Sequence, residues 1–388
     1  MPEPASQADI PVEAALLVCA SRTRLDEQKI RELRKLASLT VDWNCLFNLS
    51  RRHAVEQLVH KQLSRHAADI VPPEHLQKLK HLTQANFARN QIFTAELCRL
   101  IKLFDASRIT AIPFKGPALA LFAYGDLNLR RYVDLDIMVR KEDVLAAREI
   151  LLADGYESSK SLNLSQQQVL LQTQHNLQFH RDQGRIIVEL HWEVASHLFA
   201  SSVRAEDLWS NLIDVVVNDT SMKSLSANDL LFSLCIHGSR HLWQRLSWIC
   251  DISELISRHE INWKVLLDRS TQTASERMFL LGLVLAEKLF GTSLPPLVKE
   301  RCESDRSLKA LGDTIVGRLF AGDDQAQPST ADTFWYNIAV RKSWKARVRY
   351  MFYMLRPTDS DVKRHLPSTM KFFYYVERPF RLLFKPAK

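Results

Sequence analysis

Apolar residues recur at helical spacing through much of the first hundred positions. Between residues 75 and 104, leucine, isoleucine and phenylalanine follow one another at the interval that an α-helix places on one face. This run contains no glycine or proline, so we expect a single helix of about eight turns. Shorter amphipathic stretches at 25–36 and 45–63 precede it. The beginning of the chain is therefore predicted to be helical.

The pattern changes after residue 108, where short apolar runs replace the helical periodicity. Ile109–Phe114 is rich in β-branched residues and predicts a buried strand, with Pro113 near its end or at a sheet edge. Val133–Val139 alternates in character and predicts a second strand. Ile186–Trp192 predicts a third, which could pair with 176–180 across a turn. The middle of the chain therefore carries the strands.

Helical periodicity returns from residue 228, and the chain then ends in a polar loop and a basic segment. The whole pattern predicts an α+β protein with helical regions on both sides of a small sheet-containing core. We expect four regions: an N-terminal helical region 1–105, an α/β core 106–222, a C-terminal helical domain 223–320, and a loop with a basic helical tail 321–388. The other expected helices cover 118–124, 143–154, 229–243, 247–259, 263–271 and 276–290.

The net charge of +8 is concentrated at the C-terminal end. Residues 341–388 hold 13 lysines or arginines against 3 acidic residues, whereas the first 340 residues carry slightly more acid than base. We interpret this segment as a solvated basic tail. Binding of phosphate-rich ligands, nucleic acid or an anionic membrane surface stays open as an alternative.

The six cysteines are widely spaced and contain no C-x-x-C pair. This spacing argues against a zinc site or a disulfide framework and favours buried, reduced thiols. No apolar run reaches the roughly 20 residues that span a bilayer. The first residues also lack the basic start and apolar core of a signal peptide. We therefore expect a cytoplasmic protein without a transmembrane segment.

Two carboxylates lie two positions apart on the second expected strand. Side chains at this spacing point to the same face, so Asp134 and Asp136 would project together while Leu135 packs on the other side. Neighbouring like charges are costly unless a cation or hydrogen bonds stabilise them. Mg²⁺ prefers hard oxygen ligands and leaves room for phosphate oxygens. The pair is therefore a candidate magnesium site.

Further residues around this pair fit a phosphate-binding site. Lys115 would bring a cation to the end of the first strand, and Gly116 would let the backbone approach a triphosphate. Arg130 could fork onto a phosphate. The third expected strand supplies Glu189 as another carboxylate, with His191 on the same face. Together they describe one site.

These motifs resemble those of the uncharacterised bacterial nucleotidyltransferase family, which belongs to the DNA polymerase β-like superfamily. The resemblance covers roughly residues 40 to 290. It includes the runs IPFKGPALA from residue 112, DLDIMV from 134, ELHW from 189 and NDLL from 228, together with Tyr124-Gly125, Arg130, Gly155-Tyr156, His237-Gly238, His241-Leu-Trp243 and Asp251.

The resemblance implies a small mixed sheet with flanking helices and a site with two Mg²⁺ ions. It further implies that Asp134 and Asp136 hold both ions. Glu189 would complete the ligand set of the second ion and accept the proton of the acceptor hydroxyl. A hydroxyl oxygen would attack the α-phosphorus of a nucleoside triphosphate, and pyrophosphate would leave. The acceptor would be a small molecule, a peptide or a protein.

Two other functions stay open at this stage. A nucleotide-binding or regulatory protein that has lost turnover would keep the same fold. An RNA-end nucleotidyltransferase would explain the basic tail, but the sequence shows no RNA-binding module, so nucleic acid is the less favoured partner. His237 and His241, four positions apart on an expected helix, have a metal-binding spacing, yet we favour a packing role because no third ligand is evident.

Overall fold

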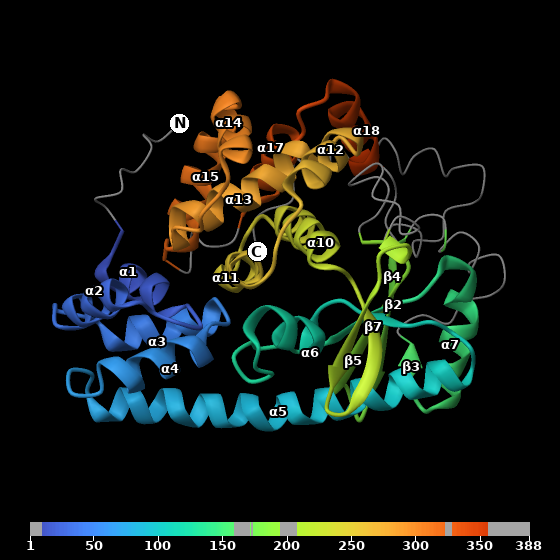
Figure 1. The fold of residues 1–388 in the computed structure, drawn as a ribbon, viewed down its shortest axis with the longest axis horizontal. Coiled ribbons are helices and arrows are strands. Elements are labelled where there is room, and N and C mark those ends of the chain that lie inside the picture. Colours follow the sequence, from blue (N-terminus) through green and yellow to red (C-terminus); the bar gives the residue numbers. More distant parts are fainter. Residues whose placement is uncertain (1–9, 159–170, 172–173, 195–207, 323–327, 356–388) are drawn as a thin grey trace.

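A five-stranded mixed sheet in the middle of the chain is flanked by helices on both sides in the sequence (Figure 1). This computed structural model describes residues 10–158, 171, 174–194, 208–322 and 328–355. The strand order is β1-β2-β5-β4-β3, in which β2 and β5 are parallel and the other neighbours antiparallel. The arrangement confirms the expected α+β fold with a small mixed sheet and flanking helical regions.

The strands are short, and most of them lie where the sequence predicts them. A separate two-stranded hairpin follows the sheet in the chain. The strands are β1 (Ile112–Pro113), β2 (Leu135–Met138), β3 (Glu157–Ser158), β4 (Asn176–Arg181) and β5 (Ile186–His191), with β6 (Ile213–Val217) and β7 (Thr220–Ser224) forming the hairpin.

The N-terminal region is helical, and its last helix is the longest of those described. It consists of α1 (Val12–Ala20), α2 (Glu27–Ala37), α3 (Trp43–Arg52), α4 (Glu56–His66) and α5 (Pro73–Ala106). With 34 residues, α5 confirms the single long helix, and it runs beneath both the N-terminal helices and the sheet (Figure 1). The stretch 45–63 instead divides into α3 and α4, because Ala54 between them has a positive φ of 54°.

The β2 strand separates an apolar face from a polar one, as its alternation predicts. Leu135, Ile137 and Val139 belong to an apolar cluster that also contains Leu100 and Phe104 of α5. The cavity described below lies on the opposite side, where Asp136 points. Packing of the apolar face on α5 therefore orients the carboxylate.

The edge position of β1 explains how a strand can contain a proline. Pro113 pairs with Ile137 of β2, and no other described strand pairs with β1. Its missing N–H therefore removes no hydrogen bond from the centre of the sheet. Pro117 follows in the first turn of α6 (Gly116–Leu119), which continues as a π-helical turn over Ala120–Tyr124.

The β6–β7 hairpin was not anticipated from the sequence. Its turn residues Asn218 and Asp219 have φ values of 44° and 60°, and these two residue types tolerate the left-handed region better than most. The β-branched run Ile213–Val217 before this turn is the signal that predicts a strand here.

The helices expected at 143–154, 229–243, 247–259, 263–271 and 276–290 are present within three residues of these ranges. They are a 3₁₀ turn (Lys141–Asp143) with α7 (Val144–Ala153) between β2 and β3, and α10 (Ala227–Arg240), α11 (Leu246–Arg258), α12 (Trp263–Gln272) and α13 (Glu276–Phe290) after the strands. No ranges were expected for the helices that follow, which are α14 (Pro296–Ser304), α15 (Arg306–Leu319), α17 (Thr330–Ala339) and α18 (Trp344–Leu355).

The helices α10, α11 and α13 pack into one core around Trp243, which is fully buried. A Cβ placed on Gly238 of α10 would lie 2.2 Å from the Trp243 ring, so only glycine fits there. The basic tail predicted for 321–388 reaches as far as α18 in the structure, and residues 356–388 lie outside the described residues.

None of the six cysteines forms a disulfide in the described part of the chain, and four of them are buried: Cys19, Cys98, Cys235 and Cys250. The expectation of burial is wrong for Cys45, which is exposed at the start of α3, and Cys302 is only half-buried. None of the described helices is long and apolar enough to cross a bilayer.

Candidate active site

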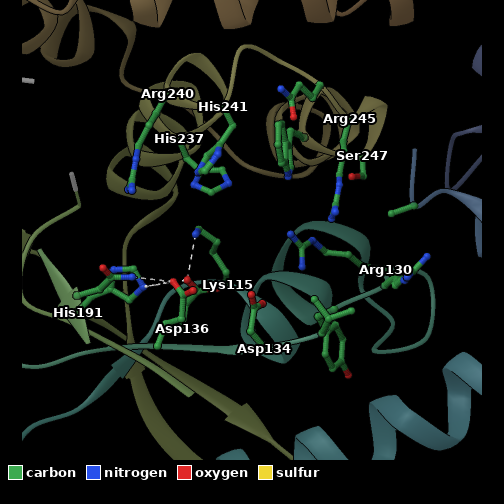
Figure 2. Close-up of a pocket in the computed structure, with 18 of the residues that line it drawn as sticks. Lys115, Arg130, Asp134, Asp136, His191, His237, Arg240, His241, Arg245 and Ser247 are labelled. Atoms are coloured by element: carbon green, nitrogen blue, oxygen red, sulfur yellow. Dashed lines mark hydrogen bonds and ion pairs between the residues drawn. The ribbon is translucent and has the colours of Figure 1, made fainter. Parts of the chain in front are cut away.

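A cavity of about 370 Å³ lies between the sheet and the helices α10 and α11 (Figure 2). One side carries Asp134 and Asp136 together with Lys115 and His191, and Glu189 also lines the cavity. The residues on the second side come from α10, from α11 and from the turn between them: His237, Arg240, His241, Gln244, Arg245, Ser247 and Trp248. The carboxylates are therefore confined to the sheet side of the cavity.

Parallel pairing of β2 with β5 places two carboxylates beside each other. Asp136 and Glu189 are direct partners in the register of these strands. His191, two residues after Glu189, points back to both: its Nε2 lies 3.0 Å from Asp136 Oδ1 and 3.3 Å from Glu189 Oε2. Asn176 of β4 donates a hydrogen bond of 2.9 Å to Glu189 Oε2. These side chains are thus held together by the sheet itself.

Lys115 contributes a second cation to the same carboxylate. Its Nζ lies 3.0 Å from Asp136 Oδ1, and both side chains are largely buried. The following Gly116 has a φ of 57°, a conformation that favours glycine. A Cβ on Gly116 would lie 3.5 Å from the backbone oxygen of Asp134, so the turn after β1 packs directly against the start of β2.

Asp134 lies immediately before β2, and its carboxylate points into the cavity beside Asp136 (Figure 2). Burial, followed by the charge of Asp136, raises the pKa of Asp134 to about 6. The ligand atoms of Asp136, Glu189 and His191 all lie within 4.8 Å of one another, and Asp134 is outside this group. The structure thus separates the expected acidic trio into a close pair with a histidine and one nearby carboxylate.

The close pair is balanced by two cationic side chains. Burial raises the pKa of Asp136, but Lys115 and His191 outweigh it and hold that pKa far below its usual range. The hydrogen bond from His191 lowers the pKa of Glu189. Burial lowers the pKa of His191, but its contacts with Asp136 and Glu189 outweigh burial and raise it. An ammonium and an imidazolium therefore stand beside the carboxylates, at the place where a metal cation would compete with them.

Arg130 lines the cavity, but its strongest contacts are within the protein. Its Nε and Nη2 donate hydrogen bonds of 2.8 Å and 3.0 Å to the two carboxylate oxygens of Asp251. Tyr124 donates a third hydrogen bond, 2.7 Å long, to Asp251, which is completely buried. The guanidinium fork expected to hold a phosphate is thus occupied by Asp251, a partner that spacing along the chain did not reveal.

His237 and His241 pack against Trp248 on the far side of the cavity. The two imidazole centroids are 4.6 Å apart, and they lie 5.3 Å and 5.4 Å from the Trp248 ring. Burial lowers the pKa of both, that of His241 to about 4. Among the described residues, neither belongs to a group of three metal-ligating side chains. The packing interpretation fits these contacts.

Arg240 and Arg245 extend this side of the cavity toward the carboxylates (Figure 2). Arg240 Nη1 lies 2.5 Å from Nε2 of His175, and burial lowers the pKa of that histidine to about 2, so it accepts the hydrogen bond as a neutral ring. Neither arginine was singled out from the sequence. Their place beside the two histidines of α10 is the signal that could have identified them.

A model of the family described as uncharacterised nucleotidyltransferase matches residues 40–291. This match spans more than half of the chain, which therefore belongs to that family. No curated protein matches the sequence. Among solved structures, an antigenic nucleotidyltransferase-like protein from Paracoccidioides brasiliensis is 16% identical, covers 57% of this chain and 92% of its own, and has a TM-score of 0.30. A similarity this low supports no conclusion by itself.

Proposed function

We propose that this protein transfers a nucleotidyl group from a nucleoside triphosphate to a hydroxyl acceptor in a Mg²⁺-dependent reaction. The observation that carries the proposal is the register of β2 with β5, which sets Asp136 directly beside Glu189 at a cavity with basic residues on its far side. Membership of the nucleotidyltransferase family agrees with this reaction class.

The residues at the cavity fit two divalent cations. Asp136 and Asp134 would hold one, and Asp136, Glu189 and His191 are close enough to hold the other. Carboxylate oxygens are the ligands that Mg²⁺ prefers, and the unusual closeness of these groups is explained if they bind a cation. When bound, the ions supply charge neutralisation at the phosphates and a lower pKa for the acceptor hydroxyl.

Side chains of the protein would accept the proton of the acceptor hydroxyl and stabilise the negative charge on the leaving pyrophosphate. As the acceptor oxygen attacks the α-phosphorus, a new O–P bond forms, the α–β phosphate linkage breaks, and pyrophosphate leaves. Glu189 would accept the hydroxyl proton. Lys115, released from Asp136, and the arginines of the far side would stabilise the negative charge that grows on the leaving pyrophosphate.

The location we propose is the cytoplasm, where nucleoside triphosphates and Mg²⁺ are abundant. Cysteines without disulfides among the described residues are consistent with this reducing compartment.

The direct experiment uses ATP, CTP, GTP and UTP labelled at the α-phosphate, each mixed with the purified protein, Mg²⁺ and a cell extract. We expect one label to become attached to a discrete acceptor, and we expect Asp136→Asn to abolish the transfer. Asp182→Asn is the matched control, because Asp182 lies in the exposed β4–β5 turn and should leave transfer intact. Binding of a nucleotide without any label transfer would show a binding protein that lacks turnover and would overturn the proposal.

A further inference from the structure

One nitrogen donor lies in the carboxylate cluster. We propose that His191 is a metal ligand, so that the position formed with Asp136 and Glu189 takes Mn²⁺ in preference to Mg²⁺. The inference rests on the proposed function for the existence of a metal site, but it concerns which metal the site selects. Asp134 lies outside this group, so the neighbouring position beside Asp136 would have oxygen ligands from the protein and suits Mg²⁺.

The spacing of the three ligand atoms fits a single octahedral ion. An ion bound at about 2.1 Å places adjacent ligand atoms about 3.0 Å apart, because neighbouring ligands subtend a right angle. The His191 Nε2 atom lies 3.0 Å from Asp136 Oδ1 and 3.3 Å from Glu189 Oε2, close to this octahedral edge. A bound ion would take the place of the proton on Nε2 and of Lys115 Nζ, which lies 3.0 Å from the same Asp136 Oδ1. The three ligand atoms could then contact one ion with little movement of the chain.

The imidazole ring is fixed in this orientation by its surroundings. His191 is 3% exposed, and its ring is perpendicular to that of Phe114 at a centroid distance of 5.1 Å. The ring of His175 contacts it from another direction at 6.1 Å. Its Nδ1 is buried without a hydrogen-bond partner among the described residues, so every polar contact of the side chain is made through Nε2. The contacts with Phe114 and His175 therefore restrict rotation of the ring and keep Nε2 toward the carboxylates.

Ligand chemistry then distinguishes Mn²⁺ from Mg²⁺. Mg²⁺ prefers oxygen ligands and keeps much of its water shell, whereas imidazole suits the first-row transition metals. Mn²⁺ accepts carboxylates and imidazole together and has the same octahedral preference at slightly longer distances. A site with two carboxylates and one imidazole therefore favours Mn²⁺ over Mg²⁺.

Pulsed electron paramagnetic resonance of the Mn²⁺-loaded protein tests the ligand directly. We expect echo modulation from a directly bound ¹⁴N nucleus, which should change to a ¹⁵N pattern when the protein is made with ¹⁵N-histidine. His191→Gln should lose the nitrogen coupling, whereas His237→Gln, a histidine of the far side, should keep it. A bound Mn²⁺ without nitrogen coupling, or a coupling that survives in His191→Gln, would overturn the inference.

Calorimetric titration measures the selectivity of the site for Mn²⁺ over Mg²⁺. Loss of His191 should weaken Mn²⁺ binding about 10- to 100-fold while changing Mg²⁺ binding little, and thermal unfolding of the variant shows whether it is folded. Equal losses for both metals in a folded variant would contradict the nitrogen-ligand role. Neither readout depends on turnover, so failure of the transferase assay with a clear ¹⁴N signal would overturn the proposed reaction alone.

Discussion

Two buried aspartates of this protein have similar partners but different surroundings. Asp136 contacts Lys115 and His191 at the cavity, and Asp251 contacts Arg130 and Tyr124 beneath it. Asp251 is completely enclosed, and Arg130 neutralises it with two hydrogen bonds. Asp136 instead shares its cations with Glu189 and has Asp134 as a second acidic neighbour.

The contrast separates a structural ion pair from a functional group. Around Asp251 charge and hydrogen bonds are balanced within the protein, so the cluster joins the loop before β2 to α11. At the cavity, three carboxylates converge where a ligand can enter, and Lys115 and His191 balance part of their charge. These carboxylates, unlike the enclosed Asp251, are therefore accessible to a ligand.

The largest expected effect is that of Asp136→Asn on turnover. The variant should lose at least about 10³-fold in transferase activity, because it removes the shared ligand of both cation positions. Its free energy of unfolding should change by no more than about 1 kcal/mol, since Lys115 can turn to water in the cavity and His191 can lose its proton. Activity assays and chemical denaturation check the two halves, and near-normal transfer would refute the assignment.

Asp251→Asn should show the opposite profile. Removing this charge leaves Arg130 buried without its counterion, so we expect a loss of about 3–5 kcal/mol in the free energy of unfolding. Urea denaturation of both aspartate variants under identical conditions makes the comparison. Equal stability of the Asp251 variant and the unaltered protein would mean that this ion pair is not structural.

Two buried histidines, His191 at the cavity and His53 in the helical core, also differ in their surroundings. The burial of His53 predicts how the stability of the protein depends on pH. Leu246 N–H donates to its Nδ1, and its Nε2 lies 3.0 Å from Leu319 O, so the ring is neutral and fully buried. Burial, followed by the charge of Arg52, lowers the pKa of His53 from 6.5 to about 4.

The unfolded chain therefore binds a proton near pH 6.5 that folded His53 does not, and stability falls as the pH decreases. Between pH 7.5 and 5.5 this residue should account for about 1.4 kcal/mol of that fall. Denaturation midpoints at both pH values, measured for the unaltered protein and for His53→Gln, isolate the contribution. The same pH slope in both proteins would contradict it.

The smallest expected effect concerns Lys115. In the nucleotide-free protein its ammonium competes with a metal for Asp136, so Lys115→Met should bind Mn²⁺ about 5-fold more tightly. Titration of the protein with Mn²⁺, monitored by the paramagnetic resonance signal of the free ion, measures this affinity. Lys223→Met, which breaks an exposed ion pair with Asp214 on the β6–β7 hairpin, is the control and should change nothing. Weaker metal binding in the Lys115 variant would show that the lysine does not compete.

Local patterns were enough to predict much of the fold. The absence of glycine and proline between 75 and 104 correctly gave one helix, and the alternation around Asp136 correctly gave a strand with one polar face. The hairpin at 213–224 was overlooked, although the β-branched run Ile213–Val217 and the turn residues Asn218 and Asp219 are signals for it. The limits of the four regions and the roles of the site residues stay predictions.

Contacts between distant segments could not be read from the sequence. The Arg130–Asp251 pair joins residues 121 positions apart, and only the packing of α11 against the π-helical turn brings them together. The pairing of Asp136 with Glu189 likewise depends on distant segments, because the sequence does not fix the register of β2 and β5. A shift of one residue in this register would turn one of the two side chains to the opposite face of the sheet. Sequence spacing alone therefore placed Arg130 on a phosphate, whereas the structure gives it a protein partner.

The central claim is that the cavity transfers a nucleotidyl group, and the position of the transferred label tests it most directly. Parallel reactions with the same nucleoside triphosphate, labelled at the α- or at the γ-phosphate, should attach only the α label to the acceptor and release the γ label as pyrophosphate. Attachment of the γ label, or α labelling that is equal in the unaltered protein and in Asp136→Asn, would contradict the account.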